Sequence, residues 1–375
     1  MDLKLNKLIK EYSYERWADD ILAGRENDLC ECANRVVSNS CLSLSRNVAG
    51  INFPPQCKPK ELLTVRNMLK AYIGKTFPHA KFFNADQLMP LELGMMFQQG
   101  FYRDELAEKN SGAAYVFDLG APWFYLLVNQ DDHLRLVYDD SVARLWQGWR
   151  DLDKLDNKIS KGIDFAWNQD LGYLCSNPDL TGTGLSVSVS MQLVGILMLG
   201  RYDELVKPLE SSIFKLSPID PSDCPLVESS KTMKFIFNFD RRTSEKQQIY
   251  LAETAIGIIS KFECECREEL AKNRKLLLMD WLARAVALAK NSELVTASES
   301  RYFHSAFRFA VVEGIANRRN VDDIDRQFAH LWLLDTVTDF PSFGKGRYFV
   351  DHKRAEYLKK AFKSFRLVNM PDKKN

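Results

Sequence analysis

Hydrophobic and polar residues alternate in several short runs up to about residue 239. The segment VVSNSCLSLSRN (36–47) alternates well enough to predict a strand, and the residues between Ala113 and Tyr138 form successive strand-like runs with short turns. The runs LSVSVSM (185–191) and KFIFNF (234–239) have the same period of two. Short strands joined by tight turns predict an antiparallel sheet.

Apolar residues at helical spacing predict helices in the segments 1–25, 59–72, 141–167, 191–209, 245–291, 299–318 and 322–334. No strand of comparable strength follows Phe239, and the segment 217–230 is rich in Pro, Ser and Asp, as in a loop. We therefore predict an α+β fold, in which an antiparallel sheet is flanked by helices and followed by an all-helical domain. The predicted division is an N-terminal helix (1–25), an α+β domain (26–255) and a helical C-terminal domain (256–375).

The composition is that of a globular protein with almost no net charge. Hydrophobic residues make up 46% of the 375 positions, and 51 Lys and Arg residues nearly balance 50 Asp and Glu residues. This balance argues against general nucleic-acid binding, so no specific nucleic-acid partner is expected. The N-terminus lacks the apolar core of a secretory signal, and the apolar stretch Leu185–Leu199 is too short and too polar to span a bilayer. We therefore predict a cytoplasmic protein without a membrane partner.

Two C-x-C pairs, Cys30/Cys32 and Cys264/Cys266, stand out among the eight cysteines. Structural zinc sites usually have two to four residues between paired cysteines, and no histidine lies close to either pair in the sequence. We therefore expect structural or free thiols and no bound metal. Disulfides are not expected in a reducing compartment.

Three local motifs occur in order along the chain, namely VVSNSCLSLSRN (36–47), NQDDHLR (129–135) and FAWNQDLGYLCSNPDLTGTGLSVSV (165–189). They resemble the motifs SSRxRxxRN, NEEDHxR and GYLTxCPTNxGTGLRAS of the ATP:guanidino phosphotransferases, and specifically of the bacterial protein arginine kinases. The resemblance implies an antiparallel sheet of the guanidino kinase and glutamine synthetase type, followed by a helical domain. It also implies phosphoryl transfer from ATP to a guanidinium, with Mg²⁺ bridging the phosphates.

The sequence departs from these motifs at the residues that carry the chemistry. Cys41, Ser43 and Ser186 stand where the family has phosphate-clamping arginines, Asn177 replaces a reactive cysteine, and Gln130 replaces an acidic residue. The positions that the resemblance assigns to the ATP site are Ser40, Cys41, Ser43, Arg135, Ser186, Val187 and Ser188. A charge-assisted hydrogen bond contributes about 1.5–3 kcal/mol, so losing most of the clamp would abolish useful ATP affinity.

Two residues remain as catalytic candidates. Asp131 stands where the family has a carboxylate that acts on the guanidinium, but it is one methylene shorter, and Arg135 keeps a phosphate-binding position. His133 and Arg46 also match family positions. For both of these we expect a structural role, with a catalytic role as the alternative.

The segment VDHKRA (350–355) resembles the family's RDxxRA element, which binds phosphoarginine. Asp351 and Arg354 are retained, and Val350 replaces the first arginine. The resemblance implies that Arg354 binds the phosphate and Asp351 the guanidinium. The alternative is an ordinary ion pair between residues three apart on a solvated helix.

The leading hypothesis is a degenerate protein-arginine-kinase-like protein, a pseudokinase that acts as a binding or regulatory module in phosphoarginine- or Clp-protease-linked protein quality control. The resemblance implies as partners a zinc-binding activator protein, a Clp-type protease and phosphoarginine-bearing proteins, and it favours a homodimer. The alternative is an active ATP-dependent protein arginine kinase that uses Asp131, Arg135 and substitute cations such as Lys215 or Arg241. ATP and Mg²⁺ are the expected cofactors only in that case. A third possibility is a purely structural partner that dimerises through the helical domain.

Overall fold

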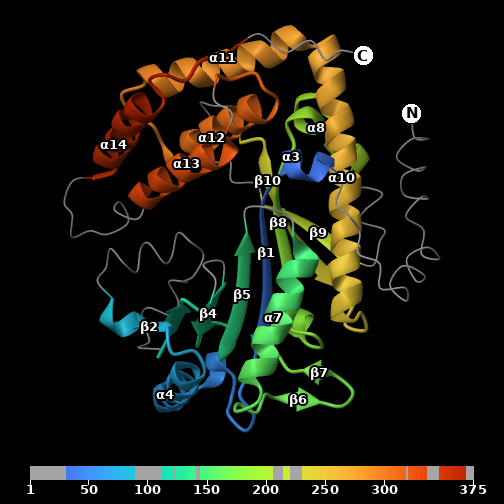
Figure 1. Cartoon of the computed structure of the whole chain (residues 1–375), viewed down its shortest axis with the longest axis vertical. Helices are drawn as coiled ribbons and strands as arrows, with labels where there is room; N and C mark the ends of the chain where they lie inside the picture. The colour runs from blue at the N-terminus through green and yellow to red at the C-terminus, as the bar shows by residue number, and fades with distance from the viewer. Residues whose placement is uncertain are drawn as a thin grey trace.

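The computed structural model describes residues 31–88, 112–120, 124–140, 144–205, 214–219, 230–317, 320–335 and 346–368. Within them, an eight-stranded antiparallel sheet with the order β2-β3-β4-β5-β1-β8-β10-β9 forms the centre of the molecule (Figure 1). The strands are β1 (Val37–Arg46), β2 (Lys81–Asn84), β3 (Ala114–Phe117), β4 (Phe124–Val128), β5 (Leu134–Asp140), β8 (Leu185–Gln192), β9 (Phe214–Ile219) and β10 (Thr232–Phe239). A separate small hairpin pairs β6 (Trp167–Asn168) with β7 (Gly172–Tyr173). The predicted antiparallel sheet is confirmed.

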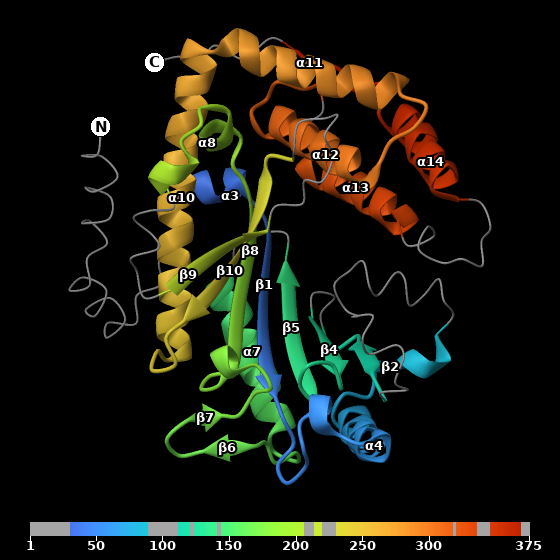
Figure 2. The same cartoon turned by 180° about the vertical axis from the view of Figure 1, so that it is seen from behind.

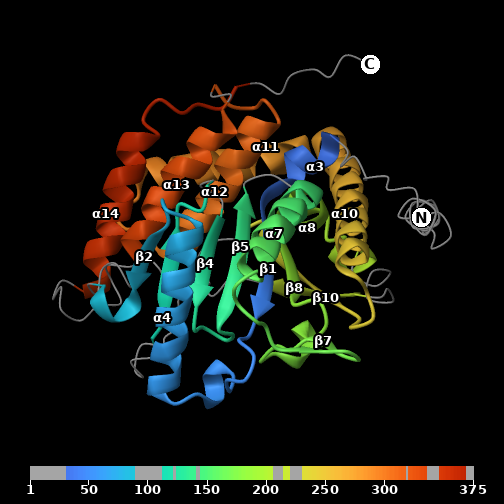
Figure 3. The same cartoon turned by 60° about the horizontal axis from the view of Figure 1, so that its bottom comes forward.

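Helices cover one face of this sheet. α7 (Leu145–Ile159) lies in front of the central strands in Figure 1 and behind them in Figure 2, and α10 (Glu245–Asn273) runs along the side of β8 and β10. α4 (Pro59–Thr76) lies over the β2–β4 end of the sheet, as the view from below shows (Figure 3). α7 approaches closely at Gly148, where a Cβ atom would lie 2.6 Å from the ring of Tyr138. A side chain at position 148 would therefore push the helix away from the sheet.

The alternation that predicted the strands also decides which side chains form the core. Every second residue of the central strands points toward α7 and belongs to the main hydrophobic cluster, as in Leu42, Leu44, Leu134, Leu136, Val187, Val189, Phe235 and Phe237. The residues between them point the other way. We call that side of β1, β5, β8 and β10 the motif face, because it carries Cys41 and Ser43 of the first motif, Arg135 of the second and the even-numbered residues of β8.

The chain continues into a helical part that surrounds a second hydrophobic cluster. This part contains α11 (Lys275–Asn291), α12 (Ala297–Val312), α13 (Val321–Asp335) and α14 (Gly346–Ala361). Phe303, Phe307, Phe328, Phe362 and Phe365 are fully buried at its centre. In the described residues after Phe239 the only β-pairing is an isolated bridge between Ala316 and Leu367.

The expected division after residue 255 falls inside one continuous helix. α10 starts at a capping box formed by Ser244 and Gln247 and runs without interruption to Asn273. Its Ile256 belongs to the first hydrophobic cluster and its Leu270 to the second. The expected N-terminal helix over 1–25 lies outside the described residues.

Short elements account for the other differences from the sequence prediction. They are α3 (Glu31–Val36), α8 (Val194–Met198) and the 3₁₀ turns η1 (Pro54–Gln56), η2 (Ala85–Gln87) and η3 (Pro178–Leu180). β9 occupies part of a segment expected to be a loop. Among the described strands it pairs only with β10, at the edge of the sheet, where Pro218 is tolerated because its missing N–H is not needed by a second neighbour. The helix expected over 191–209 begins only at Val194, because β8 extends to Gln192, and α8 ends at Met198.

A buried arginine joins α10 to the sheet and to the helical part. Arg267, only 2% exposed, donates from Nε to Glu263 (2.7 Å) and from Nη1 to Glu313 (2.9 Å). Its Nη2 donates to the backbone oxygen of Gln192 at the end of β8 (2.8 Å). One guanidinium therefore connects a strand, the long helix and the end of α12.

The two carboxylates that bind Arg267 have further partners. Glu263 accepts the N–H groups of Gly195 and Ile196 in the first turn of α8, both at 2.9 Å. Glu313 also receives Arg35 of α3 at 2.6 Å. Burial raises the pKa of Glu263, while the positive charge of Arg267 acts in the opposite direction. Each buried charge is thus compensated by hydrogen bonds.

A second buried polar network connects the end of β1 with the loop between β4 and β5 and with the loop that contains Ser176. Asn47 donates to Asp132 (2.6 Å) and accepts the N–H of His133 (3.0 Å). Asp132 also accepts the N–H of Ser176 (2.7 Å), and Nδ1 of His133 accepts the N–H of Val48 (3.1 Å). His133 is fully buried and accordingly has the structural role expected from the sequence.

No helix in the described part of the chain is both long and apolar enough to cross a bilayer.

Replacing Arg267 with methionine should strongly destabilise the protein. Arg267→Met leaves Glu263 and Glu313 without their shared cation, and breaking a buried pair in this way costs about 3–5 kcal/mol of unfolding free energy. The matched control is Arg284→Met, which removes an exposed pair with Asp280 and should cost about 1 kcal/mol or less. Chemical denaturation measures both values. Equal losses in the two variants would contradict the assigned role of Arg267.

The stability of the protein should fall with acidification partly because of His133. Burial lowers the pKa of His133 to about 4, below the ordinary value near 6.5 that the unfolded chain retains. Between these pH values the unfolded chain binds a proton that the native state does not, so the free energy of unfolding decreases as the pH falls. His133→Asn, whose amide oxygen can accept the N–H of Val48, should reduce this slope in denaturation curves recorded from pH 7 to 4. A slope equal to that of the wild type would argue against a buried neutral imidazole.

Candidate functional site

The motif face brings two of the sequence motifs into register. β1 lies between β5 and β8, with Cys41 opposite Ser188 and Ser43 opposite Ser186. All four side chains point away from α7, so four positions assigned to the ATP site share one face of the sheet. The positions that would carry phosphate-clamping arginines are therefore adjacent on this face, and they carry short neutral side chains.

Ser40 and Val187 do not belong to this surface. Ser40 is fully buried and shares the core side of β1 with Leu42 and Leu44. Val187 is also fully buried, in the main hydrophobic cluster. Alternation along the strand turns both side chains toward α7, and the assignment of these two positions to the ATP site stays a prediction.

Arg135 on β5 reaches across to β1. Its Nε donates to the hydroxyl oxygen of Ser43 at 3.0 Å, and the side chain is partly exposed. The retained arginine therefore extends toward one of the positions from which an arginine is missing.

Arg46 has a structural role on the opposite side of the sheet. It follows the core alternation of β1, is 1% exposed, and donates from Nη2 to Asp156 of α7 at 2.7 Å. Its Nη1 donates to the backbone oxygen of Thr183 (2.9 Å), and its guanidinium lies 3.7 Å from the ring centroid of Tyr173. Gly184, with φ +70°, allows this approach, because a Cβ there would lie 2.6 Å from Nη1 of Arg46. Arg46 therefore holds the T-G-T-G turn against the sheet and does not reach the motif face.

The loops that carry Asp131 and Asn177 are held together below the motif face. The hydrogen bond between the Ser176 N–H and Asp132 joins them directly. Asp131 is partly exposed, whereas Gln130 is 7% exposed. The structure thus brings the predicted carboxylate position close to the loop of the third motif.

Neither Asn177 nor Cys175 supplies a reactive group in that loop. Asn177 is exposed, and its side-chain oxygen accepts the N–H of Asp179, which caps η3. Cys175 is 7% exposed, and burial raises the pKa of its thiol to about 12. A protonated buried thiol is a poor nucleophile, so Cys175 does not replace the family's cysteine.

Cys41 is a neutral thiol at the centre of the motif face. Burial and, to a smaller extent, the charge of Asp139 raise its pKa to about 11, although Arg135 and Lys234 act in the opposite direction. At neutral pH this position therefore carries no charge.

Lys234 is a cation of this face that the sequence analysis missed. It lies on β10 opposite Ser190, and its charge acts on both Cys41 and Asp139. Asp139 in turn accepts a hydrogen bond from Asn39. The alternating run KFIFNF could have predicted this position, because Lys234 and the buried Phe235 must point to opposite faces of the sheet.

The half of the sheet beyond β5 is apolar on the same side. Tyr115, Tyr125, Leu127 and Val137 form a buried cluster there, with Phe117 packed against it. Burial also raises the pKa of the Tyr125 hydroxyl. This side of the sheet therefore changes from apolar at β3 and β4 to hydroxyl-rich on the motif face at β1 and β8.

The described residues fit a magnesium-bound triphosphate poorly. On the motif face of β1, β5, β8 and β10, the described cations are Arg135 and Lys234, and Asp139 offsets part of their charge. No group of three or more His, Cys, Asp or Glu side chains in the described ranges is arranged to hold a metal ion. We therefore derive no phosphoryl-transfer step through ATP or Mg²⁺.

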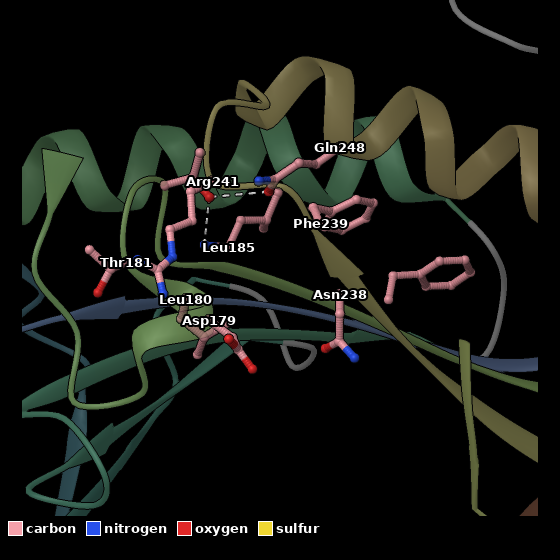
Figure 4. A pocket seen from close by; sticks show the side chains of 10 residues that line it. Asp179, Leu180, Thr181, Leu185, Asn238, Phe239, Arg241 and Gln248 are labelled. Carbon is pink, nitrogen blue, oxygen red and sulfur yellow. Dashed lines mark hydrogen bonds between the residues drawn. The ribbon is translucent and has the colours of Figure 1, made fainter. Parts of the chain in front are cut away.

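A small pocket lies at the ends of β8 and β10 (Figure 4). Arg241, one of the two suggested substitute cations, is exposed here and extends toward the turn that contains Leu180 and Thr181. The second suggested substitute cation, Lys215, lies in β9 opposite Asn238 of β10. The pocket is lined by Asp179, Leu180, Thr181, Thr183, Leu185, Phe237, Asn238, Phe239, Arg241 and Gln248. Arg241 therefore lies at the strand ends, beyond the positions of the missing arginines.

Asp351 and Arg354 lie on α14, in the helical part. They form the expected ion pair between residues three apart, but at 5% and 3% exposure they are buried and not solvated. Arg354 also donates to the backbone oxygen of Val295 at 3.0 Å, and the Val295 N–H donates to the backbone oxygen of Asp351 at 3.0 Å. The pair connects α14 to the loop before α12, so a phosphoarginine would have to displace these contacts.

Comparison with known proteins agrees with this architecture. Residues 65–217 match the family model of the ATP:guanido phosphotransferase C-terminal catalytic domain. Among solved structures, lombricine kinase superposes with a TM-score of 0.53 and 18% identity, over 63% of this chain and 68% of that chain. The duplicated taurocyamine kinase of Schistosoma mansoni gives 0.57 and 14%, over 76% of this chain and 43% of that chain. These two likenesses show the fold.

The sequence relatives are bacterial protein-arginine kinases. The protein-arginine kinase of Caldanaerobacter subterraneus subsp. tengcongensis is 25% identical over 332 residues, which cover 86% of this chain and 96% of that protein. The protein-arginine kinase of Clostridium acetobutylicum is 25% identical over 313 residues, which cover 81% and 88%. With the shared sheet and the motif positions in register, the chain is similar to the ATP:guanido phosphotransferases and, over most of its length, to the bacterial protein-arginine kinases.

Proposed function

We propose that this chain is a binding or regulatory module of the guanidino kinase fold, a pseudokinase that has lost phosphoryl transfer. One observation gives the main support for this proposal. Cys41, Ser43 and Ser186 lie side by side on the motif face, at the positions of three phosphate-clamping arginines. None of these side chains carries a positive charge at neutral pH, and none is long enough to surround a phosphate.

The expected loss of nucleotide affinity is large. Each missing charge-assisted hydrogen bond contributes about 1.5–3 kcal/mol, so three of them amount to roughly 4–9 kcal/mol if they add. Every 1.4 kcal/mol changes the dissociation constant about tenfold, so even the lower bound weakens binding roughly a thousandfold. Arg135 and Lys234 compensate for part of this loss at most, because Asp139 lies close to Lys234.

The partners of such a module would be those that the family relationship suggests. They are an activator protein that binds zinc, a Clp-type protease and proteins that carry phosphoarginine, in cytoplasmic protein quality control, with the chain itself as a homodimer. Asp351 and Arg354 remain the proposed phosphoarginine-binding residues. Their burial implies that α14 and the loop at Val295 must separate before a ligand can enter.

The alternative proposal is an active protein arginine kinase with ATP and Mg²⁺ as cofactors. It is favoured by the relatives that are protein-arginine kinases and align over most of this chain. It is also favoured by Asp131, whose neighbour Asp132 accepts a hydrogen bond from the loop of the third motif, and by Arg135, which donates to Ser43 on the motif face. In this case Arg241 at the strand ends would be the cation to test first.

Calorimetric titration with ATP and Mg²⁺ should give no binding up to millimolar nucleotide. Restoring the clamp with Cys41→Arg, Ser43→Arg and Ser186→Arg should increase affinity at least a hundredfold, because three charge-assisted contacts return. The matched control places three arginines at exposed positions on other surfaces, with Gln56→Arg, Asn273→Arg and Asn291→Arg. Micromolar, magnesium-dependent binding by the unmodified protein would refute the loss of the clamp. So would equal gains in both variants.

Incubation of the purified protein with radiolabelled ATP and an arginine-containing protein should produce no acid-labile phosphate on arginine. The reason is the absence of cationic side chains at the three clamp positions, where a single transition-state arginine contributes roughly 10³–10⁵ in rate. Formation of the label, together with its loss in Asp131→Asn and Arg135→Gln, would replace the pseudokinase proposal by the alternative.

A further inference from the structure

The helix α11 is apolar on two opposite sides, and one of them is exposed. Its inner side packs on α12 and α14. The buried residues of that side are Leu278, Trp281, Leu282, Ala285 and Ala289. The exposed residues of the other side, which we call the α11 outer face, are Leu276, Leu277, Asp280, Ala283, Arg284, Ala287 and Leu288. A helix that is apolar all round is usually buried all round, so this face is a candidate for a contact with another molecule.

The leucines of the α11 outer face are unusually accessible. Leu276 is 85% exposed, the largest value among the large hydrophobic side chains of the described ranges, and Leu277 and Leu288 are 45% and 43% exposed. Positions 276, 280, 283 and 287 follow helical spacing, and so do 277, 284 and 288, so the apolar side chains form one continuous surface. α11 lies at the top of the helical part in Figures 1 and 2, with α12 and α13 below it. Scattered exposed leucines are ordinary, whereas a continuous apolar surface marks an interaction site.

The order of residues along this face is nearly the same when it is read from either end. Leucines lie at both ends, Asp280 lies two positions before Leu282, and Arg284 lies two positions after it. A two-fold axis between identical antiparallel helices brings together residues at equal distances before and after the middle. The α11 outer face is therefore complementary to a second copy of itself.

The charged residues favour an antiparallel pair of helices over a parallel one. Within one chain, Nε of Arg284 lies 2.7 Å from a carboxylate oxygen of Asp280, and the two side chains are 72% and 53% exposed. In an antiparallel pair centred at Leu282, each of these charges also meets the opposite charge of the second copy. A parallel pair would place Asp280 beside its own copy, where like charges repel.

We propose that the α11 outer face is the docking surface for a second copy of this chain, bound as an antiparallel helix pair about a two-fold axis. This inference rests on the homodimer of the proposed function and names the surface that forms it. Leu277 packs on Leu288 of the second copy, and Asp280 pairs with Arg284 of the second copy. Leu276 packs on Ala287 of the second copy, whose short side chain lets the helices approach closely.

Sedimentation equilibrium of the full-length protein should show a dimer at micromolar concentration. Leu277→Glu places a carboxylate against Leu288 of the second copy and should raise the dimer dissociation constant at least about a hundredfold. The matched control is Leu171→Glu, at a 51% exposed leucine between β6 and β7, which should leave the dimer unchanged. A wild-type protein that stays monomeric at micromolar concentration would overturn the proposal, and so would equal effects of the two substitutions.

Exchanging the two charges tests the same surface without changing its apolar residues. Asp280→Arg brings four positive charges together at the centre of the pair, and Arg284→Asp brings four negative charges together there. Each variant alone should dimerise about tenfold more weakly than the wild type, or worse. In an equimolar mixture every contact joins opposite charges, so a heterodimer of wild-type affinity should form. Both charged residues are exposed, so the folded monomer should keep its stability.

The mixture also decides between this surface and any other. An affinity tag on one variant retains the untagged variant if the heterodimer forms. If each variant dimerises alone as tightly as in the mixture, or if the mixture stays as weak as its components, the antiparallel α11 pair is wrong. These measurements report mass and not nucleotide binding. A monomeric wild type would therefore refute the docking surface and leave the loss of the phosphate clamp untouched, whereas magnesium-dependent ATP binding would refute only the pseudokinase.

Discussion

The rest of the structure depends on β1, which is hydrogen-bonded along both edges, to β5 on one side and to β8 on the other. This double pairing fixes its register, and a slip by one residue would move every side chain to the opposite face. The side chains of Leu44 and Arg46 therefore point toward α7, and those of Cys41 and Ser43 point toward the motif face. The core and the candidate site are two sides of the same strand.

This separation explains how the fold can persist while the clamp positions change. The contacts that hold the motifs in place lie on the core side or below the sheet, as in the pair of Arg46 with Asp156 and the network of Asn47, Asp132 and His133. The side chains at Cys41, Ser43 and Ser186 contribute nothing to the main hydrophobic cluster. Replacing an arginine at these positions removes charge from the motif face and leaves the contacts of the main hydrophobic cluster intact.

Alternation and helical spacing were sufficient to predict the central strands and the long helices, because both depend on local burial of one face. β9 was missed because its proline argued against a strand, and only its place at the sheet edge makes that residue acceptable. The place of Lys234 depends on the register between β10 and β8, which are far apart in sequence. The burial of Asp351 and Arg354 depends on the loop at Val295, so a pattern within α14 alone could not reveal it. Ser40 and Val187 were assigned by resemblance, although alternation by itself would have placed them in the core.

The continuity of α10 has a consequence for how the protein unfolds. Its 29 residues form one helix that contributes side chains to both hydrophobic clusters, with Arg267 bonded to the sheet and to the end of α12. Loss of either cluster would expose one side of this shared helix and weaken the other cluster. The sheet and the helical part should therefore melt as a single cooperative unit, and a fragment ending near residue 255 would lack half of the helix on which its own core rests.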